Sequence, residues 1–401
     1  MTEKCEASVR FAELVLSLSK YPCTKRSSRD FVKTLLDSND PLDSLFIICY
    51  YVIVHVNDNM TKNRQVTITQ VAKEAGVSIQ TVSRVINNRQ EITPETRRHV
   101  QEVIKRLGYQ PNAIARSLSQ RRSHTLGVVT SGLEYYGPSH ILVGVEQGAN
   151  QAGLSILLNL LHQPESENIG KIVNGLVSRQ VEGIIWAVPE ISNNRSWFRE
   201  VLPQLSIPVI FLSTQPKEDL NVVEIDNRNG AYMATEHLLE RGYRKIGLIT
   251  GPLTWWAASE RRRGWQEALT AADIPFSDAQ VVEGNWSAES GEQGLHALLA
   301  KTPDLQAVFA CNDQMALGLM RAARSLGKRI PEDLAVVGFD DIPESAFYYP
   351  PLTTIRQGLY ELGQVAVQTF MKLREAEQRG ETSVPAQTVW LQPQLIVRES
   401  T

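Results

Sequence analysis

Residues 67–87 read TITQVAKEAGVSIQTVSRVIN, and this stretch predicts two short helices joined by a tight turn. Four apolar residues follow helical spacing in its first half: Ile68, Val71, Ala72 and Ala75. Gly76 interrupts the pattern, Ser78 is suited to cap a new helix, and helical spacing resumes at Ile79. Two such helices form the helix-turn-helix of DNA-binding proteins, although an ordinary helical hairpin has the same local pattern.

The residues after this motif predict a third helix and then a short linking segment. Thr93 and Pro94 form a typical helix start and Gly108 a typical end, so we expect a helix from Pro94 to about Arg106. Residues 60–110 would then form an all-α, helix-turn-helix domain. Residues 111–122, which include the run AIARSLSQ, are too few to form a stable helix alone.

Basic residues are concentrated around the motif. Residues 61–122 hold twelve Lys or Arg and four Asp or Glu, a net charge of +8, which leaves −11 for the rest of a chain whose total is −3. A basic module joined to a larger acidic body is expected when only one end of a protein contacts phosphate. This uneven charge favours DNA binding over an ordinary helical hairpin.

Length and composition indicate a multidomain protein of the cytoplasm. The 401 residues exceed one ordinary domain, and the four cysteines show neither disulfide nor metal-ligand spacing. No apolar run reaches the roughly 20 residues of a membrane span, and the run 45–56 lacks the flanks of a signal peptide. We find no nucleotide-binding loop, nucleophile–base pair or metal motif, so we expect no cofactor, no membrane partner and no enzyme.

From Thr125 onward, apolar strands alternate with amphipathic helices. Eight strands are predicted: 126–130, 155–161, 183–188, 208–213, 222–225, 245–250, 307–310 and 334–339. Helical patterns lie between them, for example over 230–241, 257–271 and 314–326. This alternation predicts an α/β core of two doubly wound parallel-sheet subdomains. Ligands of such folds bind at the carboxyl ends of the strands.

The sequence pattern of residues 1–59 does not match that of the rest of the chain, and this segment contains three of the four cysteines. We expect Met60 to be the natural start and 1–59 to be a non-homologous extension that is dispensable or not part of the natural protein. A membrane-surface or partner-binding arm is the alternative, and the apolar run 45–56 is its only support.

Several motifs together resemble the lactose repressor (LacI/GalR) family of transcriptional regulators. They are VAKEAGVSIQTVSRVIN at 71–87, LGYQPNAIARSL at 107–118, GPL at 251–253, EGNWSAESG at 283–291, CNDQMALG at 311–318, and VGFDD at 337–341 with YPPLTTIRQ at 349–357. The later motifs resemble the lactose-responsive branch more than the purine-responsive one. The resemblance implies a core over 123–401 like type I periplasmic binding proteins. Its N-subdomain would be about 124–223 plus 353–382, and its C-subdomain about 224–352 plus 383–401.

The resemblance assigns base reading to the second helix of the motif. Ile79, Gln80 and Arg84 match the family's positions; Gln suits adenine and Arg suits guanine, whereas Ile79 replaces a frequent aromatic residue. Four residues are candidates for phosphate contacts: Ser78, Thr81, Ser83 and Asn87. For Thr81 and Ser83, simple exposure of a polar residue is the alternative.

In residues 111–122 the resemblance implies a hinge helix that meets the minor groove. Leu118 matches the family's leucine that wedges between base pairs, and Ala115 would lie close to the groove. A simple apolar contact of a linker helix is the alternative for Leu118.

The resemblance also implies a sugar site between the two subdomains. Its ligand-binding residues would be Arg261, Trp286, Asn312, Asp340, Gln357 and Ser131. Arg, Asn and Asp suit sugar hydroxyls, and an indole suits the C–H face of the ring; Asn312 and Asp340 each follow an apolar strand. Tyr135 and Pro138 are further wall candidates, and Trp255 and Trp256 replace small residues at the rim. We expect Asp313 to be a helix N-cap.

Together these features predict a transcriptional repressor of a sugar-utilisation operon. A homodimer, more favoured than a tetramer, would bind a pseudo-palindromic operator in double-stranded DNA, and a sugar inducer, a galactoside or a related saccharide, would release it. One alternative is a family member that uses a corepressor or acts as an activator. The other is a sugar-binding protein with no role at DNA.

Overall fold

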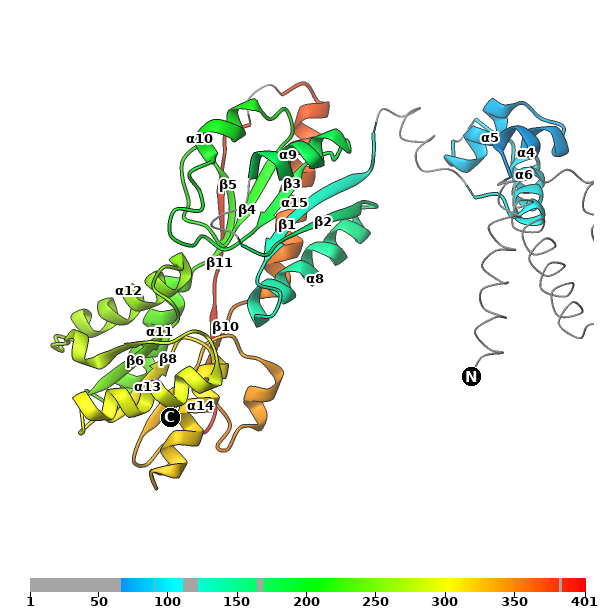
Figure 1. Ribbon diagram of the computed structural model, residues 1–401. Helices are drawn as coiled ribbons and strands as arrows, with labels where there is room; N and C mark the ends of the chain where they lie inside the picture. The colour runs from blue at the N-terminus through cyan, green and yellow to red at the C-terminus, as the bar shows by residue number, and fades with distance from the viewer. Residues whose placement is uncertain (1–65, 90, 111–121, 164–168, 382–383) are drawn as a thin grey trace, which may run out of the picture. The chain divides into compact units, whose positions relative to one another are not determined.

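The computed structural model describes residues 66–89, 91–110, 122–163, 169–381 and 384–401, which fall into two compact units divided after Asn112 (Figure 1). The expected extension 1–59 and the hinge candidates Ala115 and Leu118 lie outside the described residues.

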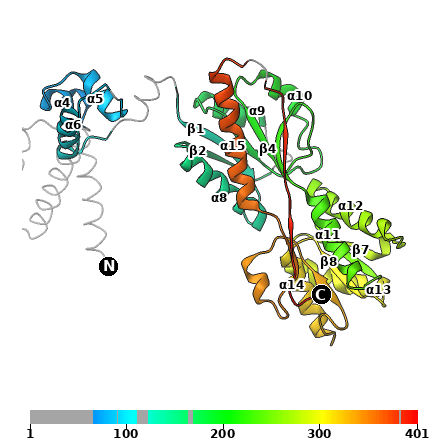
Figure 2. The ribbon, with the colours of Figure 1, turned by 180° about the vertical axis from the view of Figure 1, so that it is seen from behind.

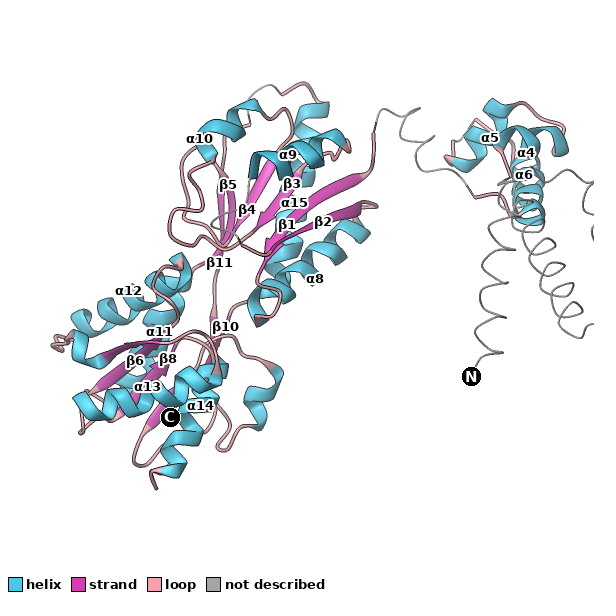
Figure 3. Cartoon of the chain, in the orientation of Figure 1, coloured by secondary structure: helices cyan, strands magenta, loops and turns pink. Residues whose placement is uncertain are grey.

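The described part of the first unit is entirely helical (Figure 3). Its helices are α4 (Ile68–Glu74), α5 (Ile79–Ile86) and α6 (Pro94–Leu107). Thr67, Ser78 and Thr93 cap them, each accepting a hydrogen bond from a backbone N–H in the first turn. Gly76 and Gly108 both adopt a φ of +63°, as the turns require. Buried valines and alanines of all three helices form a small core, so the predicted helix-turn-helix and third helix are confirmed.

The second unit contains a six-stranded parallel sheet in the order β11-β5-β4-β3-β1-β2. Its strands are β1 (Thr125–Ser131), β2 (Ser155–Leu161), β3 (Ile184–Ala187), β4 (Val209–Leu212), β5 (Asn221–Ile225) and β11 (Thr388–Leu391). One face packs on α8 (Tyr136–Gln151) and α15 (Leu359–Gln378), and the other on α9 (Ile169–Ser178) and α10 (Phe198–Val201). Figure 2 shows α8 and α15 side by side. Gly144 permits this approach, since a Cβ there would lie 2.2 Å from the Tyr360 carbonyl oxygen.

A second parallel sheet, in the order β7-β6-β8-β9, forms the other lobe of this unit. Its strands are β6 (Ile246–Thr250), β7 (Val281–Glu283), β8 (Ala307–Ala310) and β9 (Ala335–Val337). Its helices are α11 (Asn227–Glu240), α12 (Trp256–Ala271), α13 (Ala288–Lys301) and α14 (Asp313–Ser325). Beside it β10 (Thr354–Arg356) pairs antiparallel with β12 (Gln394–Ile396). The predicted α/β core of two parallel-sheet subdomains is therefore confirmed.

The subdomain boundaries differ from those expected. β11 pairs with β5, so residues 388–391 belong to the N-subdomain and not to the C-subdomain. Residues 353–356, expected in the N-subdomain, instead bridge to Val337 and Asp340 beside the C-subdomain sheet. Backbone pairing between distant segments decides the membership of such short strands, and their local pattern does not contain that information.

Candidate functional site

Helix α5 turns its apolar side inward and its predicted base-reading residues outward. Val82 and Val85 are buried in the core of the helical unit, whereas Ile79 is 47% exposed and Gln80 and Arg84 are also exposed. The Nε of Arg84 lies 3.6 Å from an exposed carboxylate oxygen of Glu91. Such an exposed ion pair contributes little, so the guanidinium is available to a nucleic acid. The helix thus presents the three residues together, while their DNA contacts stay a prediction.

The predicted phosphate-contacting residues are held by local hydrogen bonds. The Ser78 hydroxyl accepts from the Thr81 N–H at 3.1 Å and lies 2.9 Å from the Thr81 hydroxyl. Asn87 donates its amide to the carbonyl oxygen of Ser83 at 2.9 Å. These side chains therefore shape both ends of α5, and their phosphate contacts also stay a prediction.

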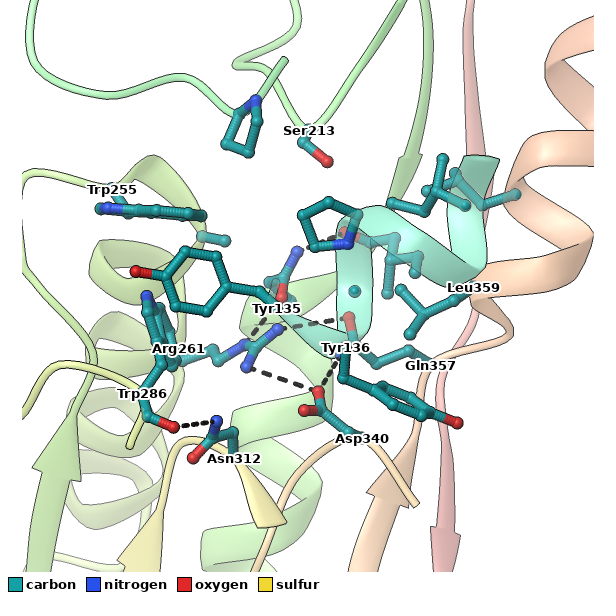
Figure 4. A pocket seen from close by; sticks show the side chains of 18 of the residues that line it. Tyr135, Tyr136, Ser213, Trp255, Arg261, Trp286, Asn312, Asp340, Gln357 and Leu359 are labelled. Atoms are coloured by element: carbon teal, nitrogen blue, oxygen red, sulfur yellow. Dashed lines mark hydrogen bonds and ion pairs between the residues drawn. The ribbon is translucent and has the colours of Figure 1, made fainter. Parts of the chain in front are cut away.

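A cavity of about 100 Å³ lies between the two subdomains of the second unit (Figure 4). Five predicted ligand residues line it: Arg261, Trp286, Asn312, Asp340 and Gln357. The wall candidates Tyr135 and Pro138 line it too. Ser131 does not: it is 4% exposed at the end of β1, and the chain turns away at Gly132 with a φ of +65°. Ser131 therefore does not line this cavity, and its contact with a ligand stays a prediction.

Arg261, on α12, is the centre of the polar network on the cavity floor. Its Nε donates to Asn227 Oδ1 at 2.8 Å, one Nη donates to Gln357 Oε1 at 3.2 Å, and the other donates to the Cys311 carbonyl. The guanidinium carbon lies 3.8 Å from the centroid of the Phe339 ring, and the residue is only 6% exposed. All three of its nitrogens are therefore engaged within the protein.

Asp340 follows β9 and faces this guanidinium. Its Oδ1 lies 4.0 Å from Arg261 Nη1 and accepts a hydrogen bond from the Gln357 amide. Burial raises the pKa of Asp340 to about 7, although Arg261 and Gln357 act to lower it. Its φ of +123° is a conformation that a residue other than glycine adopts only under strain. Strain and a shifted pKa in one cavity residue are typical of a functional position.

Aromatic rings form one wall of the cavity. Trp286 and Trp255 meet edge to face at 5.9 Å, and Trp255 meets Tyr135 across the cleft at 5.6 Å. Trp286 covers Gly251 so closely that a Cβ there would lie 2.0 Å from the indole. Its buried Nε1 has no hydrogen-bond partner within the part of the chain described. Trp256, expected at the rim, is the first residue of α12 and lines a separate outer pocket with Glu260 and Arg263.

A backbone contact, which we call the cross-cleft bridge, joins the two subdomains beside this wall. Ile191 after β3 pairs antiparallel with Trp255 before α12. The Ser192 N–H donates to the Thr254 carbonyl at 2.9 Å, and the Trp256 N–H donates to the Glu190 carbonyl at 3.0 Å. The subdomains are thus held together here as well as by the chain segments that cross between them.

Two carboxyl side chains that line the cavity, Glu224 and Glu190, were not among the residues predicted from the sequence. Glu224 on β5 is 2% exposed and accepts from the backbone N–H of Thr214 at 2.9 Å and of Ile225 at 3.1 Å. Burial raises its pKa to about 8. Glu190 accepts from the Thr214 hydroxyl and the Gln215 N–H. The signal for Glu224 was a carboxylate within the apolar strand 222–225, whereas Glu190 lies in a loop without a pattern.

Asn312, not Asp313, caps α14. Its Oδ1 accepts from the Met315 N–H at 2.8 Å, while its amide donates to the Trp286 carbonyl at 3.0 Å. Asp313 is fully buried and accepts from the Ile342 N–H and the Thr354 hydroxyl. The N-cap expected of Asp313 is therefore wrong by one residue, since α14 begins at Asp313 itself.

Two negative findings apply to the described residues alone. They contain no group of three or more His, Cys, Asp or Glu side chains that would hold a metal ion. None of the helices in those ranges is long and apolar enough to cross a membrane.

Two family models match the chain. Residues 67–112 match "Bacterial regulatory proteins, lacI family", and residues 235–401 match "Periplasmic binding protein-like domain". The lactose operon repressor of Escherichia coli (strain K12) is 34% identical over 315 residues, covering 78% of this chain and 86% of that protein. The HTH-type transcriptional regulator CelR of Thermobifida fusca is 35% identical over 354 residues, covering 85% and 100%.

Solved structures agree with these relatives. The lac repressor dimer bound to operator and the anti-inducer ONPF superposes with a TM-score of 0.74 at 32% identity, covering 84% of this chain and 99% of that chain. The complex of CelR with cellobiose gives 0.61 at 32% identity, covering 84% and 100%. The helix-turn-helix, the two-lobed core and the full-length relatives all indicate the same family. The protein is a member of the lacI family of bacterial transcriptional regulators.

Proposed function

We propose that the protein represses a sugar-utilisation operon and that a saccharide in the cavity releases it from its operator. The observation that carries the proposal is the presence of two distinct sites in one chain. The exposed face of α5 suits base edges, and the cavity offers aromatic walls with Arg261, Asn312 and Asp340 on its floor.

A homodimer on a pseudo-palindromic operator follows from the family. A relative forms a dimer on its operator, and half-sites about one helical turn apart match such a protein. The saccharide is proposed to be a galactoside or a related sugar, since relatives include a lactose operon repressor and a cellobiose-bound regulator. Saccharide and operator would oppose each other through the same coupling free energy.

The experiment selects an operator from random duplex DNA and then measures its binding by fluorescence anisotropy. We expect affinity to fall steeply with salt and Gln80→Ala to weaken selected DNA more than random DNA, by about 1–3 kcal/mol. Equal loss on both DNAs would remove Gln80 from base reading. Glu236→Gln, a change at an exposed residue of α11, is the control.

The release step is tested with lactose, galactose and cellobiose on the operator complex. We expect one of them to lower operator affinity and to raise the Tm of the core, and Trp286→Ala to abolish both effects. A ligand that strengthens operator binding would replace the inducer proposal by a corepressor. No response to any sugar would refute the saccharide site.

A further inference from the structure

Charged groups are unevenly distributed around the cavity between the subdomains. Among the residues that line it, Glu190, Glu224 and Asp340 are carboxylates and Arg261 is the single cation. The carboxyl side chains come from both lobes. In the N-subdomain Glu190 follows β3 and Glu224 lies on β5, whereas in the C-subdomain Asp340 follows β9. Burial raises the pKa of Glu224 to about 8, so this group is largely protonated at neutral pH, and Glu190 and Asp340 are the carboxyl groups that oppose an anionic ligand from the two lobes.

The one cation already has partners within the protein: three of its five N–H groups donate to protein acceptors, and it faces a carboxylate. Its guanidinium already donates to Asn227, Gln357 and the Cys311 carbonyl, and it faces Asp340 at 4.0 Å. Recognition of a phosphate or carboxylate requires unengaged, preferably forked donors. Breaking these bonds would leave buried acceptors without partners.

A second buried arginine, Arg195, lies behind the N-subdomain wall and does not line the cavity. It donates to the Thr214 hydroxyl at 3.1 Å, to Asn194 Oδ1 at 3.1 Å and to the Val188 carbonyl. Its donors are therefore engaged away from the ligand space. It holds Thr214, whose hydroxyl in turn donates to Glu190.

The polar groups left without partners suit hydroxyls instead. Within the described residues, the indole N–H of Trp286 has no acceptor, and no donor contacts Oδ2 of Asp340. One donor and one acceptor at the foot of an aromatic wall match a sugar hydroxyl, which both donates and accepts. The rings of Trp286, Trp255 and Tyr135 suit the uncharged C–H face of a sugar.

We infer that the effector of this cavity is an uncharged saccharide and that Glu190 and Asp340 exclude sugar phosphates and sugar acids. The inference rests on the proposed function, because it names the chemical class that the same site accepts. Each added negative charge would lie near the carboxylates of Glu190 and Asp340 in a partly dehydrated cleft, where like charges repel strongly.

The test compares matched neutral and anionic sugars on the full chain. The pairs are glucose with glucose 6-phosphate and galactose with galacturonate, with lactose and cellobiose as larger neutral probes; binding is measured by calorimetry and by release from the selected operator. We expect at least one neutral sugar to bind and its anionic partner to bind about tenfold more weakly or worse. An anionic sugar that binds as tightly as its neutral partner, or more tightly, would overturn the inference while leaving the proposed function intact.

Glu190→Gln tests the cause of the exclusion. The variant removes one negative charge, and its amide oxygen still accepts from Thr214 and Gln215. We expect the neutral-to-anionic affinity ratio to shrink severalfold, whereas Glu236→Gln, the same change on the exposed side of α11, leaves it unchanged. Equal ratios in both variants would contradict a role of Glu190. If none of the sugars, neutral or anionic, binds or affects operator binding, the proposed function itself fails, and the inference with it.

Discussion

The cross-cleft bridge can be weakened by a substitution that leaves α12 intact. Trp256 is the first residue of α12, where the backbone N–H is not needed within the helix and proline is well tolerated. Trp255, with φ of −82° and ψ of 127°, already has the backbone that must precede a proline. Trp256→Pro therefore removes the donor to the Glu190 carbonyl without breaking the helix.

The magnitude follows from the two hydrogen bonds of the bridge. Losing one net backbone bond costs about 1 kcal/mol, which corresponds to about a fivefold increase in local opening. The remaining bond, from the Ser192 N–H to the Thr254 carbonyl, is the probe, because its amide exchanges only when the bridge opens. We expect exchange of this amide to be about fivefold faster in Trp256→Pro than in Trp256→Ala.

Trp256→Ala is the matched control because it loses the same indole but keeps the N–H. Hydrogen exchange is measured at the Ser192 amide, and urea unfolding of both variants is compared in parallel. Equal exchange in the two variants would refute the bridge. A general rise in exchange over both subdomains would show that the proline destabilised the core instead.

Three further predictions follow from single contacts. Ser78→Ala removes the N-cap of α5 and should destabilise the helical unit by about 1 kcal/mol, whereas Ser78→Thr, which keeps a capping hydroxyl, should retain most of that stability. Equal melting temperatures of the two variants in calorimetry would contradict the role of the cap. Burial raises the pKa of Glu224 to about 8, so between about pH 4.5 and pH 8 the folded state binds more protons than the unfolded state, and the contribution of this group to stability falls as pH rises. Glu224→Gln should therefore reduce the loss of unfolding free energy between pH 6 and pH 8, measured with urea, by about 2 kcal/mol. The same loss in the variant as in the original protein would count against this role. Gly318→Ala places a Cβ 1.7 Å from the Ala288 carbonyl oxygen, so α13 and α14 must separate, and we expect thermal unfolding to show a loss of about 1–3 kcal/mol. The control is Gly175→Ala on α9, where the nearest atom is Nη1 of Arg179 at 3.5 Å, and this change should be tolerated. Similar effects of the two substitutions would refute the close packing of α13 and α14.

Long elements with a regular pattern were predictable because their burial is local. The three helices of the first unit carry caps and apolar spacing in the sequence, and the predicted strand 155–161 matches β2. By contrast β7, β10, β11 and β12 are three or four residues long, too short for a periodic signal. Their place depends on partners that are distant in sequence, as β11 beside β5 illustrates.

Local spacing and caps in the sequence were enough to predict the helix-turn-helix, and the family resemblance predicted that Arg261, Trp286, Asn312, Asp340 and Gln357 share one cavity, which all five line. The other residues that line that cavity became evident from the three-dimensional fold alone. Glu224 lines it from β5 and Glu190 from the loop after β3, whereas Trp256, at the start of α12, lines a separate outer pocket. The physical reason is that the direction and burial of a side chain depend on backbone pairing across the fold, and that pairing joins residues whose local sequences are independent.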